Sequence, residues 1–156
     1  MERVSAMRKP VSRILVINDE SVVLKELIKG LNSAAKSLDN PLGIVFSGVT
    51  TARDALSAIE TDGDLQAVIV DDTLYTLKSE TGNSRVLQMS ALELVQRITR
   101  FRPELDVYVL IAQEQEDEVV DALFTEAVDG YFYREERDYR GMYRILNAQV
   151  QERADT

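Results

Sequence analysis

The chain has 156 residues, no cysteine, no histidine and a formal net charge of −9. The length allows one domain with a sizeable core, and the missing residue types exclude disulfides, Cys/His zinc sites and Ser-His or Cys-His nucleophiles. The negative charge disfavours nucleic acid as a partner, because phosphate-binding surfaces need clustered Lys and Arg. Chemistry must therefore come from carboxylates, hydroxyls, lysines and arginines.

Apolar runs and amphipathic stretches alternate along the chain. Short apolar runs typical of strands buried on both faces occupy 14–17, 44–46, 67–70, 107–111 and 131–133. Apolar residues at helical spacing occupy 24–38, 52–59, 94–98, 117–127 and 139–150. Thr51 with Asp54, and Ser90 with Glu93, have the spacing of capping boxes, and Pro103 is expected to stop the third helix.

This alternation predicts an α/β fold, a parallel sheet with helices on both faces in three layers. We expect a disordered lead-in over residues 1–12 and a single domain over 13–153, with a long loop at 73–88. No segment approaches the roughly 20 apolar residues that a membrane span needs. The sequence therefore predicts a cytoplasmic protein without a membrane partner.

Acidic residues stand where predicted strands end. In open α/β sheets, ligands bind outside the carboxyl ends of the strands. Strand one ends in Asn18, Asp19 and Glu20, and strand three ends in Asp71 and Asp72. If these strands are neighbours, Asp19 and Asp71 converge, and two close carboxylates need a cation, a proton or an arginine. Mg²⁺ suits oxygen ligands; the alternative is that these acids only solvate the strand ends.

At these residues the chain resembles a response-regulator receiver domain. The resemblance is carried by Ile14–Glu20, Gln66–Asp71, Met89–Leu94 and Val128–Arg134. It implies the doubly wound five-stranded parallel sheet of order 2-1-3-4-5, the flavodoxin-like arrangement.

The same resemblance assigns roles to individual residues. It implies that Asp71 corresponds to the phospho-accepting aspartate and that Mg²⁺ would be held by Asp19, Asp71 and the Thr73 backbone. Tyr131 then corresponds to the switch aromatic. Asp72 is the alternative acceptor. Neighbouring residues on a strand face opposite sides, so a strand register shifted by one residue would place Asp72 at the site in place of Asp71.

The departures from the receiver pattern concern the residues that would contact the phosphoryl group. Asn18 replaces an aspartate, Ala112 stands where Ser or Thr is usual, and Arg134 replaces a lysine. Arginine is not a simple substitute for lysine, because its planar fork sits differently from a compact ammonium. The stretch between Asp71 and Met89 is also much longer than in the family. These differences favour a degenerate receiver over one that works by phosphotransfer.

The second half also resembles the receiver-like N-terminal domain of bacterial ornithine/lysine/arginine decarboxylases. The similarity lies in Leu105–Ala112 and Val128–Tyr133. In that family the domain precedes a pyridoxal-phosphate domain and helps to assemble the oligomer. This chain is too short to contain the cofactor domain, so the resemblance implies a fragment or a stand-alone relative.

These observations leave three hypotheses for the function. The first is a pseudo-receiver that regulates or oligomerises without being an enzyme or holding a cofactor. The second is a signalling receiver that is phosphorylated on Asp71 with Mg²⁺, and the third is a small flavodoxin-like enzyme, which no glycine-rich or catalytic motif supports. The helix at 117–127, the strand at 131–133 and the last helix are expected to bind a protein partner or a second copy.

Overall fold

The computed structural model describes residues 12–71, 91–112, 128–134 and 136–154. Their helices and strands, in chain order, are β1 (Ser12–Ile17), α2 (Ser21–Ser37), β2 (Ile44–Val49), α3 (Ala52–Thr61), β3 (Leu65–Asp71), α4 (Ala91–Phe101), β4 (Asp106–Ile111), β5 (Gly130–Tyr133) and α6 (Tyr139–Ala154). The expected loop at 73–88, the Ser90 cap and the helix at 117–127 lie outside the described residues. Ser12, which the sequence assigns to the lead-in, already belongs to β1.

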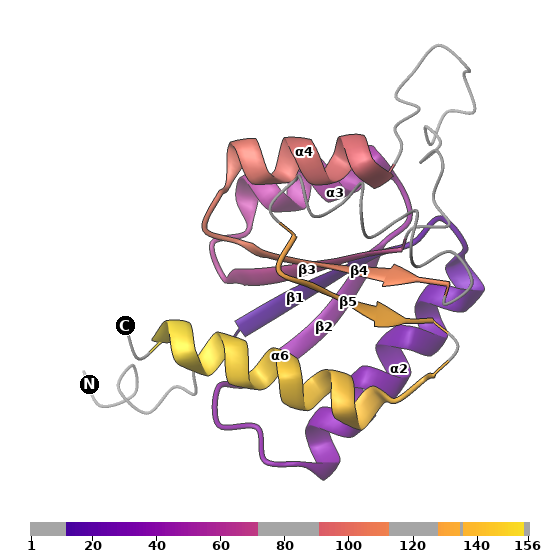
Figure 1. The fold of residues 1–156 in the computed structure, drawn as a ribbon, viewed down its shortest axis with the longest axis vertical. Helices are drawn as coiled ribbons and strands as arrows, with labels where there is room; N and C mark the ends of the chain where they lie inside the picture. Colours follow the sequence, from indigo (N-terminus) through magenta and orange to yellow (C-terminus); the bar gives the residue numbers. More distant parts are fainter. Residues whose placement is uncertain (1–11, 72–90, 113–127, 135, 155–156) are drawn as a thin grey trace, which may run out of the picture.

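The sheet has five parallel strands in the order β2-β1-β3-β4-β5 (Figure 1). This confirms the predicted three-layer, doubly wound, flavodoxin-like fold. The central strand β3 and its neighbour β4 are buried along nearly their whole length. Their continuous apolar sequences follow from this position, because each strand has helices over both of its faces.

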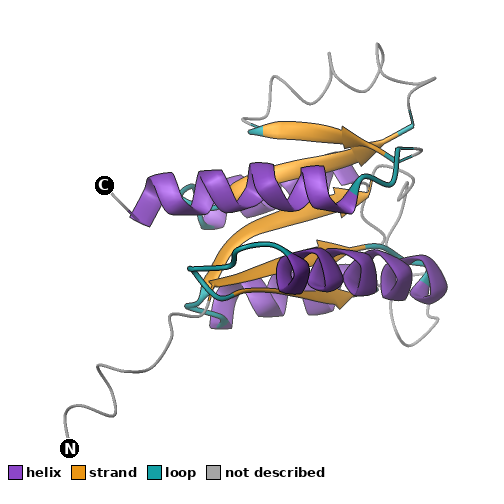
Figure 2. Cartoon of the chain, turned by 90° about the horizontal axis from the view of Figure 1, so that it is seen from below, coloured by secondary structure: helices purple, strands orange, loops and turns teal. Residues whose placement is uncertain are grey.

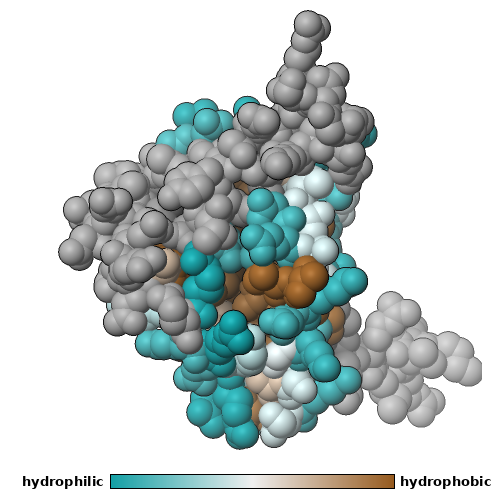
Figure 3. Space-filling model, turned by 90° about the vertical axis from the view of Figure 1, so that its right-hand side faces the viewer, coloured by the Kyte–Doolittle hydropathy of each residue, from teal (hydrophilic) through white to brown (hydrophobic). Residues whose placement is uncertain are grey.

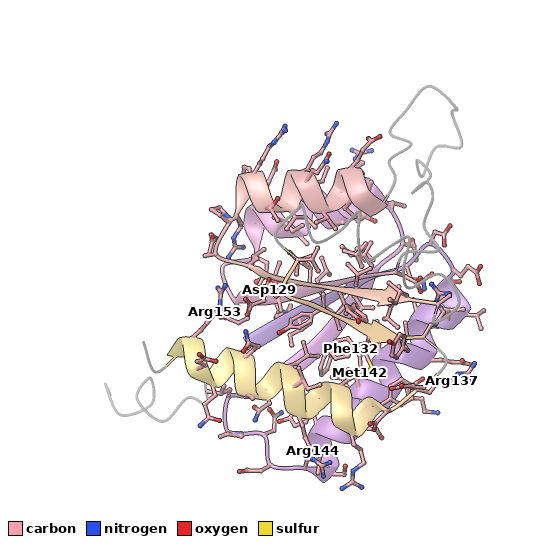
Figure 4. The ribbon with its side chains drawn as sticks, viewed as in Figure 1. Asp129, Phe132, Arg137, Met142, Arg144 and Arg153 are labelled. Carbon is pink, nitrogen blue, oxygen red and sulfur yellow. The ribbon has the colours of Figure 1, made fainter. Side chains whose placement is uncertain are left out.

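Helices α2 and α6 cover one face of the sheet (Figures 1 and 2). Their apolar stripes pack on alternate residues of the strands, including Ile14, Ile69 and Leu110. Phe132 of β5 stacks on Tyr108 with ring centroids 5.4 Å apart, and Figure 4 shows Phe132 beside Met142 of α6. The stripe on the last helix therefore faces the core, as its spacing predicts.

Helices α3 and α4 cover the opposite face (Figure 2). Ile59 of α3 and Ile98 of α4 are fully buried against the intervening strand residues Leu15 and Val68. Burial of side chains of this size contributes roughly 1.5–3 kcal/mol each. Within the described residues, no helix has both the length and the apolar character needed to cross a bilayer.

The described helix ends follow the signals in the sequence. Thr51 accepts a hydrogen bond from the Asp54 backbone through its hydroxyl at 3.1 Å, which confirms the predicted N-cap of α3. Helix α4 ends at Phe101, two residues before Pro103. Arg102 then donates from its guanidinium to the carbonyls of Ile59 and Asp62, which ties the end of α4 to the end of α3.

Gly30 lets α2 approach the first residue of α6 closely. A Cβ at position 30 would lie 2.5 Å from the Tyr139 ring. The position is helical, so alanine would gain roughly 1 kcal/mol in helix propensity if there were room. Overpacking against a ring costs roughly 1–3 kcal/mol and should outweigh this gain.

We therefore expect Gly30→Ala to lower the free energy of unfolding by about 1 kcal/mol, measured by urea denaturation. In a Tyr139→Ala background the same change should be stabilising, because the ring is gone and only the propensity gain remains. If Gly30→Ala changes the free energy of unfolding equally in both backgrounds, the close approach of the Tyr139 ring is not the reason for glycine at this position.

Candidate functional site

The carboxyl ends of the strands form one edge of the sheet, where open α/β folds bind ligands. Asn18 follows β1, Asp71 ends β3, Ala112 follows β4 and Arg134 follows β5. Figure 3 views the molecule from the side toward which β4 and β5 point, and hydrophilic residues there surround a small hydrophobic patch.

Asp71 is the centre of this edge. Its residue is only 2% exposed. Its Oδ2 accepts a hydrogen bond from the Asn18 side-chain amide at 2.7 Å, and its Oδ1 accepts one from the Arg134 guanidinium at 2.8 Å. A buried carboxylate is stable only when it is paired and hydrogen-bonded, and these two side chains meet that need from β1 and β5.

Asn18 is held in one orientation by a second contact. Its Oδ1 accepts from the Glu20 backbone N–H at 2.8 Å, while its amide nitrogen donates to Asp71. Asn18 is 2% exposed. The side-chain oxygen is thus directed at the N-cap residue of α2, and the amide hydrogens are directed at the carboxylate.

Arg134 is positioned by the sheet itself. Its backbone N–H donates to the Ile111 carbonyl at 2.8 Å, which extends the β4–β5 pairing by one residue. Its side chain is 27% exposed, against 2% for Asp71. The ion pair is therefore buried at its acidic end and reaches water at its basic end, where solvent partly screens it.

The other predicted site residues occupy different positions around this centre. Asp19 and Glu20 are exposed, and Glu20 is the N-cap residue of α2. Ala112 is buried directly after β4. Tyr131 is half-buried and makes an edge-to-face contact with Tyr133, with centroids 5.8 Å apart. Asp72 and Thr73 lie outside the described residues.

A Mg²⁺ site at this edge would depend on Asp19 and Asp71 together with residues outside the described part of the chain. The described residues contain no group of three or more acidic side chains placed to hold a metal ion. The Asn18 oxygen is directed at a backbone N–H, and a guanidinium already lies 2.8 Å from the Asp71 carboxylate. The positive charge next to Asp71 is therefore supplied by the chain itself.

The sequence predicted the positions of Asn18, Asp71 and Arg134 but not their direct contacts. In the sequence Asn18 is a departure from the receiver pattern at a position of an aspartate, whereas the structure shows it as a hydrogen-bond donor to Asp71. The signal was present in the sequence: an amide and a carboxylate follow neighbouring strands at the same edge. What the sequence lacked was the register that places Ile17 beside Val70.

Comparison with solved structures finds the same fold in receiver domains of response regulators. The chain is similar to a receiver domain from Methanospirillum hungatei JF-1, with a TM-score of 0.67 and 16% identity over 93% of this chain and 98% of that chain. It is equally similar to the signal receiver domain of an HD domain-containing protein from Pseudomonas fluorescens Pf-5, with a TM-score of 0.67 and 17% identity over 96% and 100%.

A third similar structure is a LuxR family DNA-binding response regulator from Silicibacter pomeroyi, with a TM-score of 0.60 and 18% identity over 86% of this chain and 88% of that chain. No protein-family model and no curated protein sequence matches the chain. At these identities the similarity establishes the fold: the chain has the receiver fold over nearly its whole length. One fold serves many activities, so the activity depends on the residues of the site.

Replacing Arg134 by Met tests the ion pair. Asp71 would keep the Asn18 amide but lose the guanidinium, and we expect the free energy of unfolding to fall by about 2 kcal/mol, because a charge is left buried and the solvent-exposed arginine end moderates the loss. The exposed Arg144→Met in α6 removes the same charge and should change stability by less than about 0.5 kcal/mol.

Adding Asp71→Asn to Arg134→Met should recover much of that loss, since no buried charge is left without its arginine. Chemical denaturation of the single and double variants measures the coupling. Additive effects of the two changes would contradict a direct Asp71–Arg134 interaction.

Proposed function

We propose that the chain is a degenerate receiver-like regulatory domain that acts by binding a protein partner and not by phosphotransfer. The observation that carries the proposal is the pairing of Asp71 with Asn18 and Arg134. A phospho-accepting carboxylate must present an oxygen to the incoming phosphorus. Here one oxygen accepts from an amide and the other from a guanidinium.

The charge balance supports this proposal. The receiver pattern places several acids at this edge, and those acids need a divalent cation. In this chain one of them is the neutral Asn18, and Arg134 supplies a permanent positive charge, since guanidinium groups stay protonated in proteins. Ala112 adds no hydroxyl to this edge. The arrangement suits a permanent structural ion pair between Asp71 and Arg134 better than reversible phosphorylation of Asp71.

The alternative is a working receiver that is phosphorylated on Asp71. It would require Arg134 to swing away from the carboxylate and Mg²⁺ to enter beside Asp19. The partly exposed Arg134 side chain is the feature that leaves room for this alternative. The two functions differ in their response to a phosphoryl analogue.

We expect titration with Mg²⁺ and beryllofluoride to leave the backbone amide NMR shifts of Asn18, Asp71 and Ala112 unchanged. In the variant Asn18→Asp/Arg134→Lys, a second carboxylate replaces the Asn18 amide and a compact ammonium replaces the Arg134 guanidinium. In that variant a saturable Mg²⁺-dependent change of the amide shifts should appear. A saturable response in the unmodified chain, abolished by Asp71→Asn, would instead establish the working receiver.

For the partner, we propose a second copy of the chain bound through β5 and α6. In the described part of the sheet, β5 is an edge strand that pairs with β4. Ile145 of α6 is a large apolar residue with 51% exposure. Edge strands and exposed large apolar side chains are both common places for association. The third predicted element of this surface, the helix at 117–127, lies outside the described residues.

Sedimentation velocity tests this surface. Ile145→Glu is expected to weaken self-association at least tenfold, because a charge replaces an apolar contact. Val22→Glu, at the start of α2 and 70% exposed, makes the same chemical change elsewhere and should leave association unaffected. A monomer at all concentrations would exclude the second copy as the partner.

The resemblance to decarboxylase N-terminal domains stays a prediction. It concerns the apolar strands β4 and β5, whose sequences are also those that a buried parallel sheet requires. A longer reading frame that encodes a pyridoxal-phosphate domain next to this one would support it. Such a neighbour is compatible with an oligomerising role for this chain.

A further inference from the structure

A second polar cluster lies at the opposite edge of the sheet, where β4 and β5 begin. A cavity of about 310 Å³ there is lined by Asp106, Asp129, Gln149, Glu152 and Arg153. Figure 4 shows Asp129 before β5 and Arg153 near the end of α6 at the same end of the molecule. We call this cavity the Asp106 pocket. It shares no residue with the Asp71 site.

Asp106 is the buried member of the pocket. Its side chain is 3% exposed, and its Oδ1 accepts a hydrogen bond from Arg153 at 2.8 Å. Its Oδ2 is buried and has no hydrogen-bond partner among the described residues. An unsatisfied buried carboxylate oxygen is costly, and native structures rarely keep one without a purpose. The oxygen therefore marks a place where a hydrogen-bond donor is missing.

The pocket also carries an excess of negative charge. Three carboxylates, those of Asp106, Asp129 and Glu152, face the single guanidinium of Arg153. Burial raises the pKa of Asp106, the Arg153 charge opposes this, and the charges of Asp129 and Glu152 raise it further. This excess of carboxylates favours a positively charged donor in the pocket.

The positions of the acids favour an organic cation over a metal ion. No group of three or more acidic side chains in the described parts of the chain is placed to hold one metal ion. The Asp129 carboxylate is already fixed by the Val107 backbone N–H at 2.7 Å, so it cannot move freely to complete a coordination shell. A cation with several N–H donors can reach spaced acceptors, including the half-buried Gln149 amide.

We propose that the Asp106 pocket binds a small aliphatic amine in its protonated form, with an ammonium group donating to the carboxylates that line the pocket. The volume is at the lower end of the range for ligand pockets, which suits a small free amine. Gln149, Glu152 and Arg153 belong to α6. Asp106 is the first residue of β4, and Asp129 directly precedes β5. Ligand binding would thus connect the last helix to the edge of the sheet.

The test is a titration of the full chain with 1,4-diaminobutane at constant ionic strength, followed by amide NMR and calorimetry. We expect saturable shifts confined to residues around Asp106, Asp129 and Glu152. Glu152 and Asp129 are exposed and their amide variants keep the side-chain shape, so both should fold. Glu152→Gln and Asp129→Asn should each weaken binding about three- to tenfold, whereas Glu26→Gln, on the exposed face of α2, should not.

Two further ligands distinguish the proposal from its competitors. Tetramethylammonium has the charge but no N–H donor, and equal binding of it would overturn the proposal in favour of unspecific charge attraction. Binding of a lysine-containing peptide without binding of the free diamine would assign the pocket to a protein partner and overturn the small-ligand proposal. An absence of saturable diamine binding, or affinities unchanged by both variants, would also overturn it.

Discussion

Strands β3 and β4 are buried on both faces of a parallel sheet, and the rest of the structure depends on that burial. A parallel ladder with two apolar faces needs a helix over each face. The crossovers that carry those helices bring every strand back in the same direction. Polar side chains are then confined to the two ends of the strands, because the interior has no partners for them. The Asp71 site and the Asp106 pocket lie at those ends.

The buried carboxylates at the two ends of the strands differ in their hydrogen bonding. At the carboxyl ends, Asp71 has an amide on one oxygen and a guanidinium on the other. At the amino ends, Asp106 has a guanidinium on one oxygen and none of the described donors on the other. The first arrangement is complete in itself. The second leaves a charge and a hydrogen bond that a bound cation would supply.

The receiver fold is compatible with either a switching or a static Asp71, since the fold fixes where the strand ends meet and not which charges they carry. Replacing an acid by Asn18 and a lysine by Arg134 changes the electrostatics of the edge while the backbone pairing stays the same. Under the proposed function, a domain with this site keeps the surfaces of the receiver fold without phosphotransfer and acts by binding at those surfaces.

The sequence alone determined the fold class, because continuous apolar runs and helical stripes depend only on neighbours along the chain. Runs such as Ile14–Ile17 and the cap at Thr51 were read correctly for that reason. The contacts of Asn18, Asp71 and Arg134, and the meeting of Asp106 with Arg153, were decided by tertiary structure. Those partners lie 47 to 63 positions apart, and only strand register and helix packing bring them within hydrogen-bonding distance.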